Sequence, residues 1–252
     1  MEILPRALLL GALAFLTGCA APAPPPPPNT ALVPVPKLEN DFYDWWGRHQ
    51  AILDTKDAIN PTIVLVGDSI THLWGGSPPW TGRPAGGPAA FARTFAGERV
   101  LNLGFGYDRI QNVLWRLDHG EIAGLHPRWF VVNIGTNNLV ATARAPANTA
   151  AEIDAGVGAV LGRLRAQSPK SGIVLMAIFP RGELPSNPLR QRVAEVNALL
   201  ARRAAPGVVY LDLGPRLVEP DGRIDRAIMP DFLHPGEAGY TRWGDALGPI
   251  IR

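Results

Sequence analysis

The chain has 252 residues, which is enough for one well-buried domain and too few for two of ordinary size. Hydrophobic residues make up 46% of the chain and charged residues 18%, a balance typical of globular proteins. The formal net charge is only +2, and no run of Lys or Arg forms a basic patch. Nothing in the composition therefore supports a nucleic-acid partner.

The first 18 residues have the pattern of an export signal. Arg6 precedes an apolar stretch, residues 7–16, which is about half as long as a helix that spans a bilayer. The stretch is followed by Thr-Gly-Cys, so that residues 16–19 resemble a bacterial lipobox. We expect the signal peptide to be removed and Cys19 to be lipidated, which leaves no thiol for a disulfide, a metal or a nucleophile. An ordinary signal peptide with an incidental cysteine is the alternative.

Several acyl chains on one cysteine give durable membrane anchoring. Ala20 follows the cysteine and is similar to the outer-membrane sorting pattern of Gram-negative lipoproteins. The prolines that follow predict a semi-rigid tether, which would hold the domain roughly 40–50 Å from the lipid. The sequence thus predicts an exported, lipid-anchored protein facing the periplasm or the cell surface. Its parts are a signal peptide (1–18), a lipidated cysteine with a tether (19–36) and a folded domain (37–252).

In the folded part, apolar runs of strand length alternate with segments of helical spacing. The runs are nearly continuous in apolar residues, as expected of parallel strands buried on both faces; they cover 62–66, 99–103, 129–134, 173–179 and 208–211. Helical spacing predicts helices at 110–117, 153–164 and 189–200, with further helices at 41–53 and 236–247. The alternation predicts an α/β fold, a parallel sheet with helices on both faces.

Three polar motifs follow the first three predicted strands. Ser69, in Gly-Asp-Ser-Ile, has an exposed hydroxyl if it enters a helix, although the preceding aspartate is commonly just a helix cap. Gly104 lets the backbone approach a ligand and offer an N–H, or else forms a tight turn. Asn137 can donate to a developing oxyanion, or cap a turn. Ligands bind at the carboxyl ends of parallel strands, so we expect these motifs to lie together in one site at that edge of the sheet.

The fourth motif is Asp231-Phe232-Leu233-His234. A carboxylate at this spacing can hold the imidazole Nδ1–H and leave Nε2 free as a base, the tautomer that a serine nucleophile requires. The remaining histidines, His49, His72, His119 and His126, have no acid at such a spacing. No two of the five histidines share a metal-binding spacing, so we expect neither a metal nor a cofactor.

In this order the four motifs resemble the blocks of the SGNH/GDSL hydrolase family, named for Ser, Gly, Asn and His. Residues 101–109 and 112–117 are similar to the branch that contains the catalytic subunits of platelet-activating-factor acetylhydrolase and their bacterial relatives. The resemblance runs from about residue 41 to residue 240. It implies a flavodoxin-like three-layer α/β/α sandwich whose five-stranded parallel sheet has the order 2-1-3-4-5.

The resemblance also implies roles for single residues. Ser69 would be the nucleophile, His234 its base and Asp231 the carboxylate that orients the base. The oxyanion hole would consist of the Ser69 N–H, the Gly104 N–H and the Asn137 side chain. The expected activity is that of a carboxylic ester hydrolase on short acyl groups, especially acetyl, carried by carbohydrate or phospholipid-like alcohols. Alternatives are a periplasmic O-acyltransferase that uses the same residues and a non-catalytic surface-binding lipoprotein, against which the full residue set argues.

A loop dense in Gly and Pro is expected between residues 75 and 94, after Ser69. So long a loop is a wall or lid beside the site, or a surface insertion. Asp68, Trp74 and Phe105 are candidates for a wall that contacts substrate, and so is Trp80, although aromatic side chains near a site often serve packing instead. For an exported lipoprotein, an acetylated glycan is the favoured substrate.

Overall fold

The structure, a computed structural model, describes residues 28–40, 42–78 and 85–252. The predicted signal peptide, Cys19, most of the predicted tether and Trp80 lie outside the described residues. Within the described part, no helix is both long enough and apolar enough to cross a membrane.

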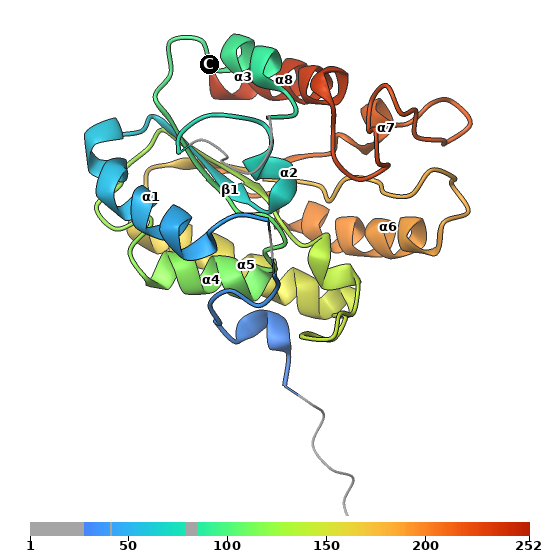
Figure 1. The fold of residues 1–252 in the computed structure, drawn as a ribbon, viewed down its shortest axis with the longest axis horizontal. Coiled ribbons are helices and arrows are strands. Elements are labelled where there is room, and N and C mark those ends of the chain that lie inside the picture. Colours follow the sequence, from blue (N-terminus) through green and yellow to red (C-terminus); the bar gives the residue numbers. More distant parts are fainter. Residues whose placement is uncertain (1–27, 41, 79–84) are drawn as a thin grey trace, which may run out of the picture.

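Five parallel strands form one sheet in the order β2-β1-β3-β4-β5 (Figure 1). They are β1 (Ile63–Gly67), β2 (Val100–Gly104), β3 (Trp129–Asn133), β4 (Gly172–Met176) and β5 (Val208–Leu211). The bounds of each differ by at most three residues from those expected from its apolar run. The all-parallel sheet of order 2-1-3-4-5 is confirmed.

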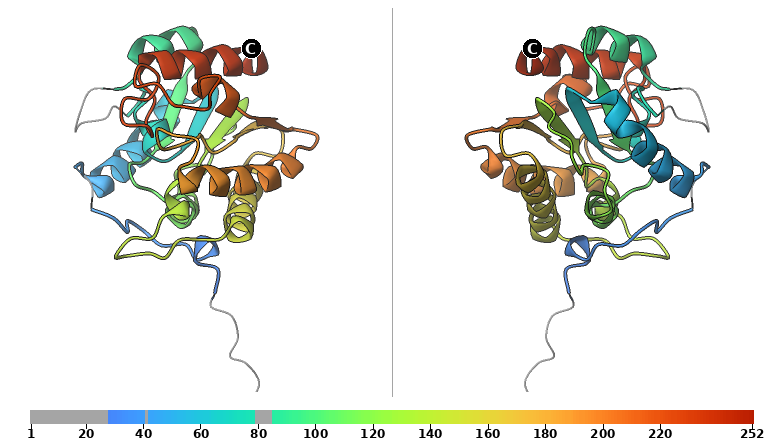
Figure 2. Two further views of the ribbon diagram at one scale, coloured as in Figure 1. Left: turned by 90° about the vertical axis from the view of Figure 1, so that its right-hand side faces the viewer. Right: turned by 90° about the vertical axis from the view of Figure 1, so that its left-hand side faces the viewer.

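Helices cover both faces of this sheet (Figures 1 and 2). One layer consists of α1 (Trp45–Ile59), α4 (Ile110–Asp118), α5 (Ala150–Gln167) and α6 (Pro188–Leu200). The other consists of α2 (Ser69–His72), α3 (Pro88–Thr94), α7 (Gly214–Leu217) and α8 (Glu237–Ile251). Three short 3-10 helices, η1 (Thr30–Leu32), η2 (Asn137–Leu139) and η3 (Ala201–Arg203), complete the described elements.

Alternate strand residues feed two separate cores. Val64 and Val66 of β1 pack into the core under α1, α4, α5 and α6, whereas Ile63 and Leu65 pack into the core under α3 and α8. Side chains in successive strand positions point to opposite faces, so a sheet covered on both sides needs apolar residues at every position. This is why each strand is a continuous apolar run in the sequence. The two cores, one on each face of the sheet, confirm the three-layer sandwich.

Three expectations about elements were wrong. The Gly- and Pro-rich segment is not one long loop, because α3 occupies its second half and packs against α8. Helix α1 begins only at Trp45, where Asp44 caps it by accepting a hydrogen bond from the Gly47 N–H. The predicted tether ends early, because Ala31 is fully buried and the Asn29 side chain donates to the backbone of α5.

Candidate active site

Ser69 stands at the first position of α2, directly beyond the end of β1. The carboxylate of Asp68 caps this short helix by accepting a hydrogen bond from the Ile70 N–H at 2.9 Å. The first N–H groups of a helix have no intrahelical acceptor. The Ser69 N–H therefore remains available to a ligand beside its own hydroxyl.

The loop before α8 brings His234 to this serine. Ser69 Oγ lies 2.8 Å from His234 Nε2, and His234 Nδ1 lies 2.7 Å from Asp231 Oδ2. The other oxygen of Asp231 accepts the backbone N–H of His234 at 2.7 Å, which fixes the carboxylate relative to the ring. Partial burial raises the pKa of Asp231, but the two hydrogen bonds from His234 outweigh it and hold the pKa below its usual value. The acid is thus ionised beside the ring, as a base–orienter pair requires.

Asn137 opens η2 just beyond β3 and faces the same end of the sheet. Its Nδ2 donates to the backbone oxygen of Asp108 at 2.9 Å. An amide nitrogen carries two hydrogens, so one remains for an oxyanion. This bond also joins Asn137 to the loop that follows β2.

The structure contradicts the assignment of the Gly104 N–H to the oxyanion hole. That N–H donates to the side-chain oxygen of Asn102 at 2.7 Å. A Cβ at Gly104 would collide with the backbone of His72, so the glycine is explained by close packing of β2 against α2. Gly104 therefore serves packing and not anion binding.

The turn after Gly104 contains a different donor. The N–H groups of Phe105, Gly106 and Asp108 bond to Gly67 O at 3.1 Å, His72 Nδ1 at 3.3 Å and Phe105 O at 3.2 Å, respectively. The Tyr107 N–H is the one in this turn without a partner among the described residues. Tyr107 also has a left-handed backbone, with a φ of 61°. Nothing in the sequence except the two glycines before it, at 104 and 106, signalled this residue.

A buried ionic network supports the turn from behind. The Asp108 carboxylate accepts hydrogen bonds from Arg116 Nε and Trp45 Nε1, both at 2.8 Å, and Arg116 also pairs with Glu121 at 2.6 Å. Glu121 in turn lies 2.7 Å from His49 Nδ1. Burial raises the pKa of Asp108 to about 6, although Arg116 opposes the shift. The network connects α1 and α4 to the turn after β2, whose Asp108 backbone oxygen accepts the hydrogen bond from Asn137.

Three of the four predicted wall residues are fully buried and cannot form a wall that substrate touches. Asp68, Trp74 and Phe105 each have 0% exposed surface. Trp74 stacks on Trp243 in the core under α8, with ring centroids 4.2 Å apart. The Phe105 ring lies 3.9 Å below the Arg116 guanidinium. These side chains serve packing and capping.

Arg181, which follows β4, lies near Asp68 and Asp231 and was not anticipated. Its Nη1 donates to the backbone oxygen of Thr136 at 3.1 Å, next to Asn137. Burial lowers the pKa of Arg181, while the nearby carboxylates of Asp68 and Asp231 oppose that shift. Burial also raises the pKa of Asp68 to about 7, and Asp68 Oδ2 has no partner among the described residues. The position of Arg181 just after the carboxyl end of a strand is the feature of the sequence that could have indicated it.

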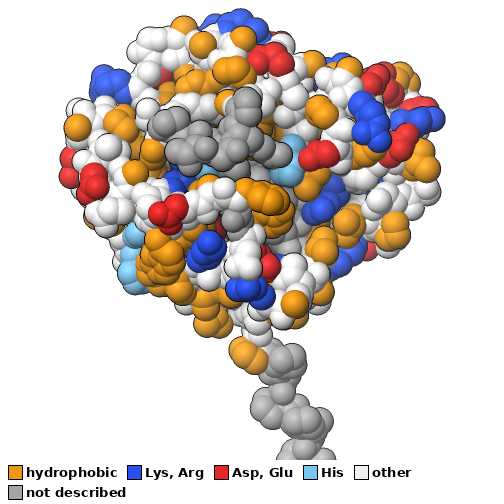
Figure 3. Space-filling view, in the orientation of Figure 1, with side chains coloured by type: hydrophobic (Ala, Val, Ile, Leu, Met, Phe, Trp, Pro, Cys, Tyr) orange, Lys and Arg blue, Asp and Glu red, His pale blue; other side chains and the backbone are white. Residues whose placement is uncertain are grey.

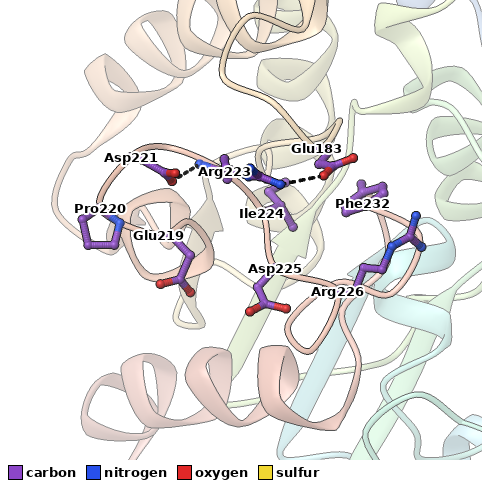
Figure 4. Close-up of a pocket in the computed structure, with 9 residues that line it drawn as sticks. All are labelled: Glu183, Glu219, Pro220, Asp221, Arg223, Ile224, Asp225, Arg226 and Phe232. Carbon is purple, nitrogen blue, oxygen red and sulfur yellow. Dashed lines mark hydrogen bonds and ion pairs between the residues drawn. The ribbon is translucent and has the colours of Figure 1, made fainter.

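The surface view shows an exposed histidine beside hydrophobic side chains near the middle of the face that carries α2 (Figure 3). A separate pocket of about 650 Å³ lies next to Phe232, two residues before His234 (Figure 4). It is lined further by charged residues of the segment 219–226. Among the described residues, no group of three or more His, Cys, Asp or Glu side chains is placed to hold a metal ion.

The sequence matches the model of the GDSL-like Lipase/Acylhydrolase family over residues 65–242. It is 32% identical over 220 residues to the alpha1 subunit of human platelet-activating factor acetylhydrolase IB, covering 86% of this chain and 87% of the relative. It is 35% identical over 210 residues to the alpha2 subunit from Rattus norvegicus, covering 82% and 83%.

Solved structures of similar fold include a GDSL-like lipase from Bacteroides thetaiotaomicron, with a TM-score of 0.62, 16% identity and coverage of 81% of this chain and 98% of the other. An acetylxylan esterase from Geobacillus stearothermophilus has a TM-score of 0.59 and 20% identity, covering 76% and 94%. The family match spans more than half of the chain, and the curated relatives align along most of its length. The chain belongs to the GDSL-like lipase/acylhydrolase family and is a carboxylic ester hydrolase.

Proposed function

We propose that this esterase hydrolyses short-chain acyl esters, acetyl esters above all, through a covalent acyl-enzyme on Ser69. The observation that carries the proposal is the contact chain from Ser69 Oγ to His234 Nε2 at 2.8 Å and from His234 Nδ1 to Asp231 at 2.7 Å. A serine hydroxyl is a weak nucleophile until an adjacent base removes its proton. These distances are those of proton transfer.

In the proposed reaction, His234 Nε2 takes the proton from Ser69 Oγ as this oxygen bonds to the ester carbonyl carbon. The carbonyl π electrons move to the carbonyl oxygen, which becomes an oxyanion. His234 then gives the proton to the leaving alcohol oxygen as its bond to carbon breaks. Water repeats the sequence on the acyl-enzyme, which releases the acid and restores the Ser69 hydroxyl.

Three donors are proposed to receive the oxyanion: the Ser69 N–H, the second Asn137 Nδ2 hydrogen and the Tyr107 N–H. Asn137 bonds to Asp108, the residue after Tyr107, so the last two donors lie on one side of the site. Preorganised donors of this kind stabilise charge without reorganising during the reaction. Tyr107 takes the place that Gly104 was expected to fill.

The proposed substrates are acetyl esters. An acetylated glycan is the favoured one, and a phospholipid-like acetyl ester is the other. The curated relatives are named acetylhydrolases and the Geobacillus structure an acetylxylan esterase, so both names refer to the removal of acetyl groups. The predicted export signal at residues 1–18 favours a glycan, because an exported enzyme would meet cell-wall and extracellular polysaccharides. We also propose that the enzyme is anchored through a lipidated Cys19.

The first test is labelling with a fluorophosphonate probe, followed by hydrolysis of p-nitrophenyl esters of increasing acyl length. Ser69→Ala is expected to abolish both labelling and turnover. Ser186→Ala, which changes an exposed serine in the segment after β4, is the matched control and is expected to retain both. Labelling that persists in Ser69→Ala would mean that a different serine reacts.

The second test separates hydrolysis from acyl transfer. Wild-type enzyme is incubated with an acetyl ester, with and without an acceptor sugar, and the products are identified. Free acetate in equal yield under both conditions supports the hydrolase. Acetylated acceptor as the main product would instead favour the O-acyltransferase that uses the same residues.

A further inference from the structure

Among the residues that the structure describes, three other than glycine have a left-handed backbone: Asn60 with a φ of 43°, Tyr107 with 61° and Phe232 with 60°. This region is sterically unfavourable for side chains larger than that of glycine, and for bulky residues it is a rare conformation. Such strain persists only where the surrounding structure or the function compensates for it. Each of the three therefore needs an explanation.

Two of the three are explained by the fold. Asn60 ends α1 as its C-cap, where its N–H donates to Lys56 O at 3.1 Å, and Asn is a common left-handed cap. The Phe232 ring lies 4.2 Å from the guanidinium carbon of Arg226, at one side of the pocket shown in Figure 4. Its carbonyl oxygen also accepts the Gly182 N–H at 2.8 Å.

Tyr107 has no such compensation within the described residues. Its side chain makes no hydrogen bond, ion pair or ring contact there, and 48% of the residue is exposed. A glycine at this position would adopt the same turn without strain. The fold itself thus gives no reason for a tyrosine at position 107.

The position of the turn gives a reason. Backbone bonds join it to Gly67 O and His72 Nδ1, the residues two before and three after Ser69, and to Asn137 Nδ2 through Asp108. Tyr107, which is partly exposed, therefore lies at the rim of the site, next to the donors proposed for the oxyanion.

We propose that the Tyr107 side chain determines specificity by packing against the alcohol part of a bulky, ring-bearing ester such as an acetylated sugar. This inference rests on the proposed esterase function. When the carbonyl carbon is at Ser69 Oγ and the carbonyl oxygen faces the donors, the larger alcohol part extends toward solvent past this rim. An aromatic ring supplies a flat apolar face for the C–H face of a sugar and a hydroxyl for its polar edge.

The test compares kcat/KM for an acetylated xylo-oligosaccharide with kcat/KM for ethyl acetate, whose alcohol part is too small to reach the rim. In Tyr107→Gly the ratio of the two is expected to fall about tenfold, chiefly through KM for the oligosaccharide. Tyr107→Phe keeps the ring and is expected to keep the ratio. Tyr107→Asn removes the ring with a residue that tolerates the left-handed region, and repeats the measurement should the glycine variant fold poorly.

Asn60→Gly is the matched control, because it relieves the same kind of strain at the end of α1 and is expected to leave the ratio unchanged. A ratio that stays at its wild-type value in both ring-free variants would overturn the proposal, as would a wild-type enzyme that hydrolyses ethyl acetate but not the acetylated oligosaccharide. Failure of the proposed function would look different, since wild type would then hydrolyse neither ester.

Discussion

Asp68 is a buried acid next to the proposed nucleophile, and its pKa of about 7 gives it a distinctive effect on stability. Because the folded-state pKa is raised above the ordinary value of 3.8, the folded protein holds this proton more tightly than the unfolded chain. Stability therefore falls as pH rises from about 4 to about 7, and the full penalty is present above pH 7.

Asp68→Asn is expected to remove this penalty, since an amide mimics the protonated acid and still caps α2. The gain in unfolding free energy over wild type should be near zero at pH 4 and grow to as much as about 4 kcal/mol at pH 8. Urea titrations at several pH values measure it. Asp212→Asn is the matched control, because Asp212 makes the same kind of contact, with the Gly214 N–H, while exposed. Equal pH trends in the two variants would contradict the prediction.

Asn137 and its neighbour Asn138 are adjacent in sequence but differ in their contacts. Asn137→Ala removes a proposed oxyanion donor and is expected to lower kcat about 10²- to 10³-fold, with little loss of stability. Asn138 is fully buried and bonds to Gln111, Asn148 and the Ile110 N–H, so Asn138→Ala is expected to lower stability more than kcat. Ester hydrolysis and thermal melts of both variants decide the matter. Near-normal kcat in Asn137→Ala would exclude this residue from the oxyanion hole.

At the scale of elements, the Arg116 network joins α4 to the turn at residues 105–108. Arg116→Met leaves the carboxylates of Asp108 and Glu121 buried without their cation, which is expected to cost about 3–5 kcal/mol of unfolding free energy. Arg163→Met breaks the ion pair between α5 and Asp118, which is partly exposed, and should cost at most about 1 kcal/mol. Denaturant unfolding of both variants provides the comparison. Equal losses would mean that the buried network contributes no more than a surface pair.

The sheet was predictable because each strand is buried on both faces and must therefore be apolar throughout. Helix α3 was not, because its segment is rich in Gly and Pro and depends on tertiary contacts. Glu237 of α8 accepts the Ala90 N–H at the start of α3, a contact 147 residues apart in sequence that no local pattern reveals. Propensity and periodicity reflect only the residues of the element itself. They therefore cannot predict α3, which is stabilised by its contacts with α8.

The same difference between local and long-range contacts decides which features of the candidate site were predictable from the sequence. The contact between His234 and Asp231 was predictable because their spacing of three residues within one loop is local. The oxyanion donor was placed at Gly104 because the sequence does not show that Asn102 occupies that N–H. Trp74 and Phe105 were placed on the substrate side because burial of an aromatic ring depends on the packing around it.

For the molecule as a whole, the proposed lipid anchor would hold the domain closer to the membrane than the sequence alone implied. The Asn29 side chain already bonds to α5, and the Asn112 side chain donates to Pro36 O at 2.6 Å, so residues 29–36 belong to the domain. The tether predicted from the sequence then comprises residues 20–28. At about 3.1 Å per residue in a polyproline conformation, it would span about 28 Å.

The proposed lipidation of Cys19 predicts where in the cell the enzyme works. When the full chain is produced in a Gram-negative bacterium fed an alkyne-tagged fatty acid, the wild type is expected to carry the tag and to sediment with membranes. Cys19→Ala is expected to lose both properties, because the residue that would carry the acyl chains is gone. Ala20→Asp is the matched variant, expected to keep the tag but move from the outer to the inner membrane. Tagging that survives in Cys19→Ala would refute lipidation at this residue, and an untagged wild type would leave an ordinary signal peptide as the explanation of residues 1–18.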